Sequence, residues 1–557
     1  MTKQLDLADA VRRHVQPGDR VHLVVGHSRW SAAAYELVRQ SWGTDPGFTL
    51  VMLSLSSLGA LFFRGGLVRK VVTAYSGDSF PTYTPNPIYQ DAYQSGRVEV
   101  EHWSILTFQQ RLEAAARGLP AMVTGSLAGS SMATNADFME VETPAGRVGL
   151  VTPLQPDVAI MHGVVADRDG NVALSPPSLE GVWGALAAKR GAIVTVEKVV
   201  DDISFVADRV LVPGHRVLAV VEAPFGAHPG GLFARGLPDE GYGEDVEFWV
   251  SVRNATRGDF DAWAREWVLD VGGHDGYLRA LGHDRLAWLR GRTDPESWRA
   301  DEAAHPVDRD APITSWETAA AIGVRVLRER IDAAGAHAVL AGAGVANLAA
   351  WVGVTGARAE GNQVVLTAEL GMWNYSPTPA DPYIFNHRSF PTAGALSDAS
   401  HVLGLMIGGH GTRVIGCLGA AQVDRFGNIN STDIPGRSFL VGSGGANDVA
   451  SRAAECLVVT QARPHRMPAD VGYITGPGER VRTVVTDLGV FRKHDGELWL
   501  AAVPASDGLV DERVKAAVAA VGWDLEVERD VAELAPVTMP EVLALRRYDP
   551  ERLFLAD

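Results

Sequence analysis

Residues 166–174, ADRDGNVAL, recur in form as residues 423–431, VDRFGNINS. Each stretch follows a hydrophobic run, VAIMHGVV at 158–165 and RVIGCLGAAQ at 413–422. Asp-Arg-x-Gly-Asn is good turn chemistry, because Asp and Asn side chains bond to nearby backbone groups and Gly accepts a positive φ. The pair predicts that one strand-and-turn unit occurs twice, with the Asp-Arg turn as scaffold and not as catalyst.

The order of the neighbouring segments repeats as well. A strand, a turn and a helix are predicted at 17–40 and again at 335–354, and a buried strand is predicted next at 48–59 and at 363–373. A helix and another apolar strand follow the two Asp-Arg turns, at 178–200 and at 442–460. Strands that alternate with helices indicate an α/β fold with largely parallel sheets. We therefore predict two duplicated open α/β domains with the active site at their interface.

The predicted domains are residues 1–290 and 314–557. Between them, residues 291–313 are charged, contain three prolines and show no periodicity, which is typical of an exposed linker. Residues 338–357 contain no charged side chain, but their glycines and Asn347 favour a buried strand–turn–helix over a membrane span.

Composition narrows the function classes. The formal net charge is −17 and no run of Lys or Arg stands out, so we expect no nucleic-acid partner, which would require clustered positive charge. The first residues lack the apolar core of a signal peptide. The two cysteines, Cys417 and Cys456, show neither metal-ligand spacing nor a disulfide framework. These features predict a cytoplasmic protein without a membrane or a metal site.

At one strand end the two halves differ in a chemically important way. The second half has Thr367-Ala368-Glu369-Leu370-Gly371, whereas the first half has only Ser and Leu at residues 54–59. An apolar strand that ends in Glu delivers a lone carboxylate from the interior. Because burial raises the pKa of such a group and removes its hydration, it needs a partner or a chemical role.

Two glycine-rich turns accompany this carboxylate, at residues 342–347 and 442–447, and each opens a predicted helix. Such turns expose backbone N–H groups that hold an oxyanion or a phosphate. Neither completes the G-x-G-x-x-G dinucleotide fingerprint, and the chain contains no Walker A, G-x-S-x-G or H-E-x-x-H motif.

Together these segments resemble a known family. Residues 314–549 resemble the β-subunit of glutaconate CoA-transferase through GAGVANLAA, Glu369-x-Gly371, AAQVDRFGNINST, VGSGGAND, YITGPG, LAAVPA and GWDLEV. The first half resembles the α-subunit through its Asp-Arg turn, VTVEKVVD, VEAPFGAHPGG and the EWVLDV…GYLRALG stretch. The chain thus resembles a class I coenzyme A transferase with its α- and β-subunits fused.

The resemblance implies an enzyme that moves CoA from an acyl-CoA to a carboxylic acid by a ping-pong mechanism, with Glu369 as the nucleophile that carries a glutamyl-CoA thioester. CoA is then a co-substrate, no cofactor or metal is bound permanently, and a homodimer is expected by analogy. The resemblance assigns the oxyanion and acyl site to Gly342, Gly344, Asn347 and Gly371, and CoA binding to Gly442, Ser443, Gly444, Gly445, Ala446 and Asn447.

The chain departs from the family pattern in the first turn of the first half, Val25-Gly26-His27-Ser28-Arg29. Gly26, Ser28 and Arg29 are candidate substrate contacts, and Arg29 is a candidate for binding a carboxylate; a salt bridge on a helix face is its alternative role. Two other functions stay open on the same fold. One is hydrolysis or ring-opening carbon–carbon cleavage of a CoA ester, and the other is non-catalytic acyl-CoA sensing.

Overall fold

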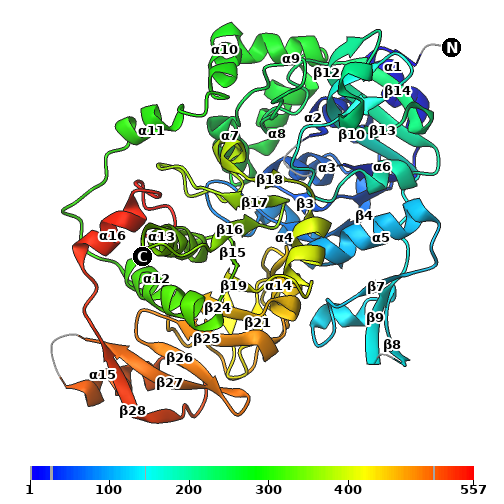
Figure 1. Cartoon of the computed structure of the whole chain (residues 1–557). Helices are drawn as coiled ribbons and strands as arrows, with labels where there is room; N and C mark the ends of the chain where they lie inside the picture. Colours follow the sequence, from blue (N-terminus) through cyan, green and yellow to red (C-terminus); the bar gives the residue numbers. More distant parts are fainter. Residues whose placement is uncertain (1–2, 25–28, 145, 506–508) are drawn as a thin grey trace.

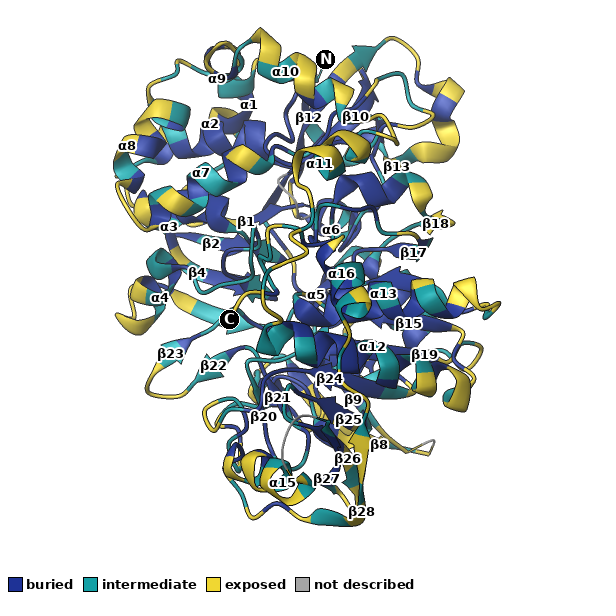
Figure 2. Cartoon of the chain, turned by 90° about the vertical axis from the view of Figure 1, so that its left-hand side faces the viewer, coloured by how far each residue is buried: buried dark blue, intermediate teal, exposed yellow. Residues whose placement is uncertain are grey.

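The computed structural model describes residues 3–24, 29–144, 146–505 and 509–557 of the chain. The protein has two α/β halves, and the first half lies above the second in Figure 1. Each half is built around its own sheet, whose strands are buried while the outer helices expose one face to solvent (Figure 2).

The sheet of the first half has the strand order β14-β12-β10-β1-β2-β4-β6, and all neighbours in it are parallel. These strands are β1 (Arg20–Leu23), β2 (Phe48–Val51), β4 (Val68–Thr73), β6 (Glu99–His102), β10 (Val158–Asp167), β12 (Gly191–Val200) and β14 (Val217–Glu222), with β11 (Val172–Ala173) and β13 (Val210–Val212) as antiparallel additions. The helices are α1 (Leu7–His14), α2 (Ser31–Ser41), α3 (Ala60–Arg64), α4 (Pro87–Gln94), α5 (Ile105–Arg117), α6 (Trp183–Ala187), α7 (Val246–Thr256), α8 (Phe260–Ala264), α9 (His274–Leu281) and α10 (His283–Gly291).

The sheet of the second half has the order β18-β17-β16-β15-β19-β24-β25-β26-β27-β28, and it is parallel from β16 to β25. Its strands are β15 (Ala338–Ala341), β16 (Val365–Ala368), β17 (Met372–Tyr375), β18 (Ala395–Leu396), β19 (Val414–Gly419), β24 (Glu455–Val459), β25 (Val481–Val485), β26 (Val490–His494), β27 (Glu497–Pro504) and β28 (Val527–Leu534). Its helices are α12 (Ser315–Ala334), α13 (Val345–Ala359), α14 (Ala446–Arg452), α15 (Val510–Ala519) and α16 (Met539–Arg546).

The strand orders confirm the predicted duplication. The run β14-β12-β10-β1-β2 in the first half corresponds to β25-β24-β19-β15-β16 in the second. The Asp-Arg turns follow β10 and β19, and they are built alike. Asp167 accepts a hydrogen bond from the backbone N–H of Asn171 at 2.8 Å, and Asp424 accepts one from Asn428 at 2.9 Å. Both turns are scaffold, as the sequence predicts.

Local sequence explains where the key elements of the second half start. Thr314 caps α12 in a capping box with Glu317, and Gly335 ends this helix in the left-handed region at φ 57°. The chain then enters β15, all of whose residues are buried, and α13 starts after Gly344. The predicted strand–turn–helix at 338–357 is therefore confirmed. Within the described ranges, no helix combines the length and apolar character that a membrane crossing requires.

The segment between the halves differs from its prediction. It contains a short helix, α11 (Trp298–Ala304), where an irregular linker was expected. None of the α11 residues is buried, which agrees with its exposed position in Figures 1 and 2. Ion pairs explain why it is ordered, because Asp301 pairs with Arg292 at 2.6 Å and also with Arg388 of the second half.

Candidate active site

A cavity of about 670 Å³ lies between the two halves, within the usual range of about 300–1,000 Å³ for ligand sites. Its wall contains the residues that follow β2 and β15, together with Glu369 directly after β16. Ligands of parallel α/β sheets bind at the carboxyl ends of the strands. Here the carboxyl ends of corresponding strands from both halves contribute to one cavity.

Glu369 sits on the tight turn between β16 and β17, and both sides of this turn are fixed. The backbone N–H of Leu179, from the first half, donates to the carbonyl of Leu370 at 3.2 Å, and that of Ser397 donates to the carbonyl of Gly371 at 2.8 Å. Gly371 has a φ of 118°, and a Cβ there would lie 2.4 Å from the Ser397 carbonyl oxygen. Only glycine fits this position, so the Glu-x-Gly pattern has a steric cause.

The Glu369 carboxylate is adjacent to the start of α14. The backbone N–H of Gly445 donates to Oε2 of Glu369 at 3.1 Å. Burial raises the pKa of Glu369 to about 7, and the negative charge of Asp448 contributes to the rise, while the Gly445 hydrogen bond opposes it. Asp448 is itself buried and accepts hydrogen bonds from the Ser104 hydroxyl at 2.6 Å and the Leu106 N–H at 3.0 Å.

The loop at residues 442–446 lines the cavity, but most of its N–H groups are already used. Gly442 donates to Ser431, Gly444 donates to Ala74, and Ala446 donates to Ser443. The prediction that this loop presents a free array of N–H groups to a ligand is therefore wrong for these three residues. The first half anchors the loop through Ala74, and the loop in turn supplies Gly445 to Glu369.

The second glycine-rich turn opens α13 and also lines the cavity. The N–H of Gly342 donates to the Cys417 carbonyl at 2.7 Å as part of the sheet, so this group is not available to a substrate oxyanion. The sequence-based assignment of Gly342 as an oxyanion donor is thus corrected. Gly344 has a φ of 80°, which favours glycine, and a Cβ there would meet no atom within 4 Å. Ala343, Gly344 and Val345 are the cavity residues at the start of α13.

Three other predicted site residues do not belong to the cavity wall in the described structure. Asn347 is buried and donates to the Pro382 carbonyl at 3.0 Å. Asn447 is also buried; it donates to the Thr475 carbonyl at 2.9 Å and accepts from the Leu127 N–H at 2.9 Å. Gly371 packs against Ser397. The structure gives these residues positioning roles, because helix-start side chains find partners in other segments that no local pattern reveals.

The predicted substrate contacts of the first half are only partly described. Gly26 and Ser28 lie outside the described residues. Arg29 is buried and donates to the Ser175 carbonyl, and it is not among the residues that line the cavity. Burial lowers the pKa of Arg29 to about 10, against the opposite effect of Tyr242 and Glu180. This burial is at odds with the proposed binding of a substrate carboxylate by Arg29, and also with a salt bridge on an exposed helix face.

Sequence reasoning missed Arg466, a cation on the cavity wall. Its guanidinium lies 5.0 Å from the centre of the Trp316 ring, and burial lowers its pKa. Arg463, three residues earlier, pairs with Asp487 at 2.8 Å. For Arg466 we find no carboxylate within ion-pair distance among the described residues. The charge stands in an irregular loop, and its proximity to Trp316 has no sequence signal.

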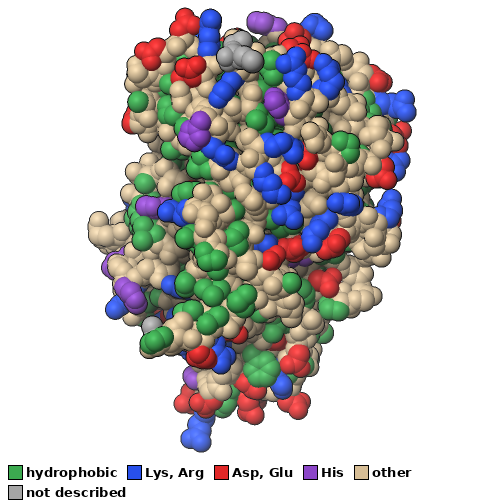
Figure 3. Space-filling model, turned by 90° about the vertical axis from the view of Figure 1, so that its right-hand side faces the viewer, with side chains coloured by type: hydrophobic (Ala, Val, Ile, Leu, Met, Phe, Trp, Pro, Cys, Tyr) green, Lys and Arg blue, Asp and Glu red, His purple; other side chains and the backbone are tan. Residues whose placement is uncertain are grey.

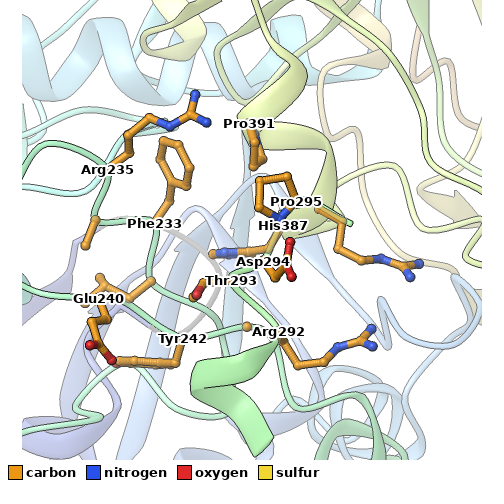
Figure 4. Close-up of a pocket in the computed structure, with 14 residues that line it drawn as sticks. Phe233, Arg235, Glu240, Tyr242, Arg292, Thr293, Asp294, Pro295, His387 and Pro391 are labelled. Carbon is orange, nitrogen blue, oxygen red and sulfur yellow. The ribbon is translucent and has the colours of Figure 1, made fainter. Parts of the chain in front are cut away.

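A smaller pocket of about 180 Å³ lies where the linker meets both halves. Figure 4 shows Phe233 and Arg235 of the first half facing His387 and Pro391 of the second, with Thr293 and Asp294 between them. Its arginines serve the fold, since Arg292 and Arg388 share Asp301. In the part of the chain that is described, no group of three or more His, Cys, Asp or Glu side chains is arranged to hold a metal ion.

Comparisons with known proteins assign both halves. The family model described as coenzyme A transferase matches residues 5–223. One of the two subunits of glutaconate CoA-transferase from Acidaminococcus fermentans is 30% identical over 322 residues, which cover 52% of this chain and 95% of that protein. The other type of subunit is represented by the 3-oxoadipate CoA-transferase of Pseudomonas knackmussii, which is 30% identical over 206 residues, covering 33% of this chain and 77% of that protein.

The fold of the whole chain is also known. The crystal structure of an acyl-CoA transferase from Escherichia coli O157:H7 superimposes with a TM-score of 0.65 at 13% identity, and the match covers 96% of this chain and 95% of that one. Relatives of the two types of subunit match different parts of this chain. The chain therefore belongs to the coenzyme A transferase family of enzymes, with the parts related to the two subunits fused in one polypeptide.

Proposed function

We propose that this protein transfers CoA from an acyl-CoA to a carboxylic acid through a covalent thioester on Glu369. The observation that carries the proposal is the carboxylate of Glu369, held by Gly445 in a cavity between the halves, with a pKa raised to about 7. A carboxylate with this pKa is substantially ionised at neutral pH and more basic than an ordinary one, as a nucleophile should be.

Each proposed step exchanges one activated acyl bond for another. A Glu369 oxygen attacks the thioester carbonyl, and the C–S bond breaks to give an acyl-glutamyl anhydride and the CoA thiolate. The thiolate attacks the glutamyl carbonyl, forming the Glu369–CoA thioester and releasing the donor carboxylate. The acceptor carboxylate then reverses both steps, and the Glu369 carboxylate is restored. No step needs a redox change or an external energy source.

The tetrahedral intermediates require donors for a developing oxyanion. The start of α13 supports this role, because the first N–H groups of a helix have no partner within it. Ala343, Gly344 and Val345 bring these groups to the cavity wall. Gly344 remains from the sequence prediction of this site, and Gly342 is replaced by its two neighbours.

Arg466 is the proposed partner of a CoA phosphate. Changing Arg466 to Gln should raise KM for acyl-CoA about tenfold, the loss of one charged hydrogen bond, and leave kcat nearly unchanged. The difference should shrink with added salt, because the ionic contact is screened. Steady-state kinetics at two salt concentrations check it, with the exposed Arg358→Gln as the matched control. An unaltered KM in Arg466→Gln would remove Arg466 from the binding site.

Isotope exchange tests the proposed transfer. An acyl-CoA mixed with its own labelled free acid should become labelled without any second substrate, since the first half-reaction is reversible. A hydrolase would instead consume the acyl-CoA at the same rate with or without acid. Absence of exchange with every acyl-CoA and acid pair tried would reject the transferase proposal.

The same exchange should depend on pH through Glu369. Only the ionised carboxylate attacks, so kcat/KM for exchange should rise with pH up to about 7 and then level off. Asp448 raises the pKa of Glu369 by charge repulsion, so Asp448→Asn should move this limb toward lower pH. A limb that stays in place in Asp448→Asn would show that another group controls it.

A homodimer stays a prediction of the family resemblance. Figure 3 shows hydrophobic side chains gathered in the lower middle part of one face. Exposed Val123 on β7 (Met122–Thr124) and Met139 on β8 (Phe138–Thr143), which share one small sheet with β9 (Gly146–Val151), are candidates for burial between two copies. The mass in solution, against 59.5 kDa for one chain, tests it.

A further inference from the structure

Aromatic rings from three distant segments line the first-half side of the cavity. Tyr83 is stacked between Tyr383 and Phe554, with ring centres 6.2 Å apart in both pairs and interplanar angles of 29° and 11°. Phe80 meets Tyr383 edge-on at 5.6 Å. Tyr83, Tyr383 and Phe554 all belong to the cavity wall. The row joins a loop of the first half to two segments of the second half, so it is a tertiary feature of the assembled site.

The row has a defined anchor. Asp549 accepts a hydrogen bond from the Phe554 N–H at 2.8 Å, and the Thr314 hydroxyl donates to the Leu555 carbonyl at 2.5 Å. Further large apolar side chains extend the same wall, among them Trp30, Met52, Leu53, Trp249 and Phe385. A fixed wall of ring faces and aliphatic side chains favours a bulky apolar ligand group, and aromatic pairs add to the burial of area.

The charges around this wall oppose a ligand with a second carboxylate. Arg466, the one cation on the described part of the wall, is taken up by the proposed CoA phosphate site. Behind the rings lie two largely buried acids, Glu244 and Asp381. The charge of Glu244 is felt by both Tyr83 and Tyr383, and burial followed by repulsion from Asp381 raises the pKa of Glu244 to about 8.

Asp381 has a cation nearby, because Arg388 lies 3.5 Å from it. We find no comparable partner for Glu244 among the described residues. A carboxylate at the far end of an acyl group would therefore be buried beside acids and without a cation, and an unpaired buried charge is strongly unfavourable.

We propose that the acyl group handled by this enzyme is bulky, ring-containing and uncharged, an aromatic or alicyclic monocarboxylic acid, and that dicarboxylic acyl groups are excluded. The inference rests on the CoA transfer proposed above. It separates this chain from the relatives named for glutaconate and 3-oxoadipate, which are acids with two carboxylates.

The test compares kcat/KM for exchange with phenylacetyl-CoA, cyclohexanecarbonyl-CoA, acetyl-CoA, succinyl-CoA and glutaryl-CoA, each with its own acid. Phenylacetyl-CoA should exceed succinyl-CoA by at least about 100-fold. Binding of the same esters to Glu369→Gln, measured by calorimetry, gives a second reading that does not depend on turnover. Higher kcat/KM for succinyl-CoA or glutaryl-CoA than for both ring esters would overturn the inference.

Two variants locate the cause. Tyr83→Ala should lower the ratio of phenylacetyl-CoA to succinyl-CoA by at least about tenfold. Glu244→Gln, which keeps the shape, should raise kcat/KM for glutaryl-CoA by about five- to tenfold. Phe205→Ala, an exposed aromatic outside the cavity, is the control. Equal effects of Tyr83→Ala on all esters, or no gain for glutaryl-CoA in Glu244→Gln, would contradict the inference.

The two proposals fail in different ways. If only the dicarboxylic esters exchange label, the acyl-group inference is wrong and CoA transfer stands. If none of the five esters exchanges label or leaves CoA on the protein, both are rejected.

Discussion

Replacing Glu369 with Gln is expected to lower kcat/KM for CoA transfer by at least about 10⁴-fold, the scale of removing a nucleophile from its catalytic unit. The amide is nearly the same size and still accepts the N–H of Gly445, which lies 3.1 Å from Oε2. The variant therefore keeps the turn between β16 and β17 and loses only the attacking group. Initial rates with an acyl-CoA and a carboxylic acid measure the effect.

Two further variants define the effect of Glu369→Gln. Glu369→Asp keeps the charge but withdraws the oxygen by one methylene, and should lose about 10²-fold, as expected for a misplaced group. Glu360→Gln, the same change at an exposed glutamate, should leave the rate unaltered. Substantial transfer by Glu369→Gln would place the nucleophile elsewhere. Binding of acyl-CoA by Glu369→Gln should persist, which distinguishes lost chemistry from lost folding.

Gly445→Ala should lower kcat/KM by about 10²- to 10³-fold without preventing folding. Gly445 has φ −88° and ψ 2°, a conformation open to alanine. An added Cβ would lie 2.1 Å from Oε2 of Glu369, so the carboxylate must move and lose its N–H donor. Kinetics and thermal unfolding, measured together, check both parts of this expectation.

The control for Gly445→Ala is Gly411→Ala, where a Cβ meets nothing within 4 Å. A double variant sharpens the test, because Gly445→Ala should add little to the loss already caused by Glu369→Gln if both act on the same carboxylate. Full activity in Gly445→Ala would mean that the observed position of Glu369 is not the one used in the reaction.

The sequence predicted the fold well, since its evidence is local. The repeated Asp-Arg turns and the strand–turn–helix segments carry their signals within about twenty residues, and the matching strand orders of the two sheets confirm the duplication. The linker prediction was less accurate. Helix α11 buries no residue, so it leaves no hydrophobic period in the sequence, and its ordering depends on ion pairs to Arg292 and Arg388.

The candidate site was predicted only in part. Glu369 was recognised because it breaks an apolar strand, a local signal. The use of N–H groups could not be read from the glycine-rich turns, because the acceptors of Gly342 and Gly444 are the distant Cys417 and Ala74. For the same reason Arg466 was missed, since its neighbour Trp316 is far away in the chain.

The aromatic wall has the same origin. Tyr83, Tyr383 and Phe554 come from three segments that meet only when the halves assemble. Each ring taken alone is an ordinary core residue in the sequence. The chemistry of the nucleophile was thus accessible from a local pattern, whereas the features that select the substrate are tertiary.

The most direct test of the central claim is mass spectrometry of the protein after incubation with an acyl-CoA and no acceptor acid. The account predicts an added mass of CoA, located on the peptide that contains Glu369, absent in Glu369→Gln and discharged by a carboxylic acid. Consumption of acyl-CoA with no CoA on that peptide, or an adduct that persists in Glu369→Gln, would contradict it.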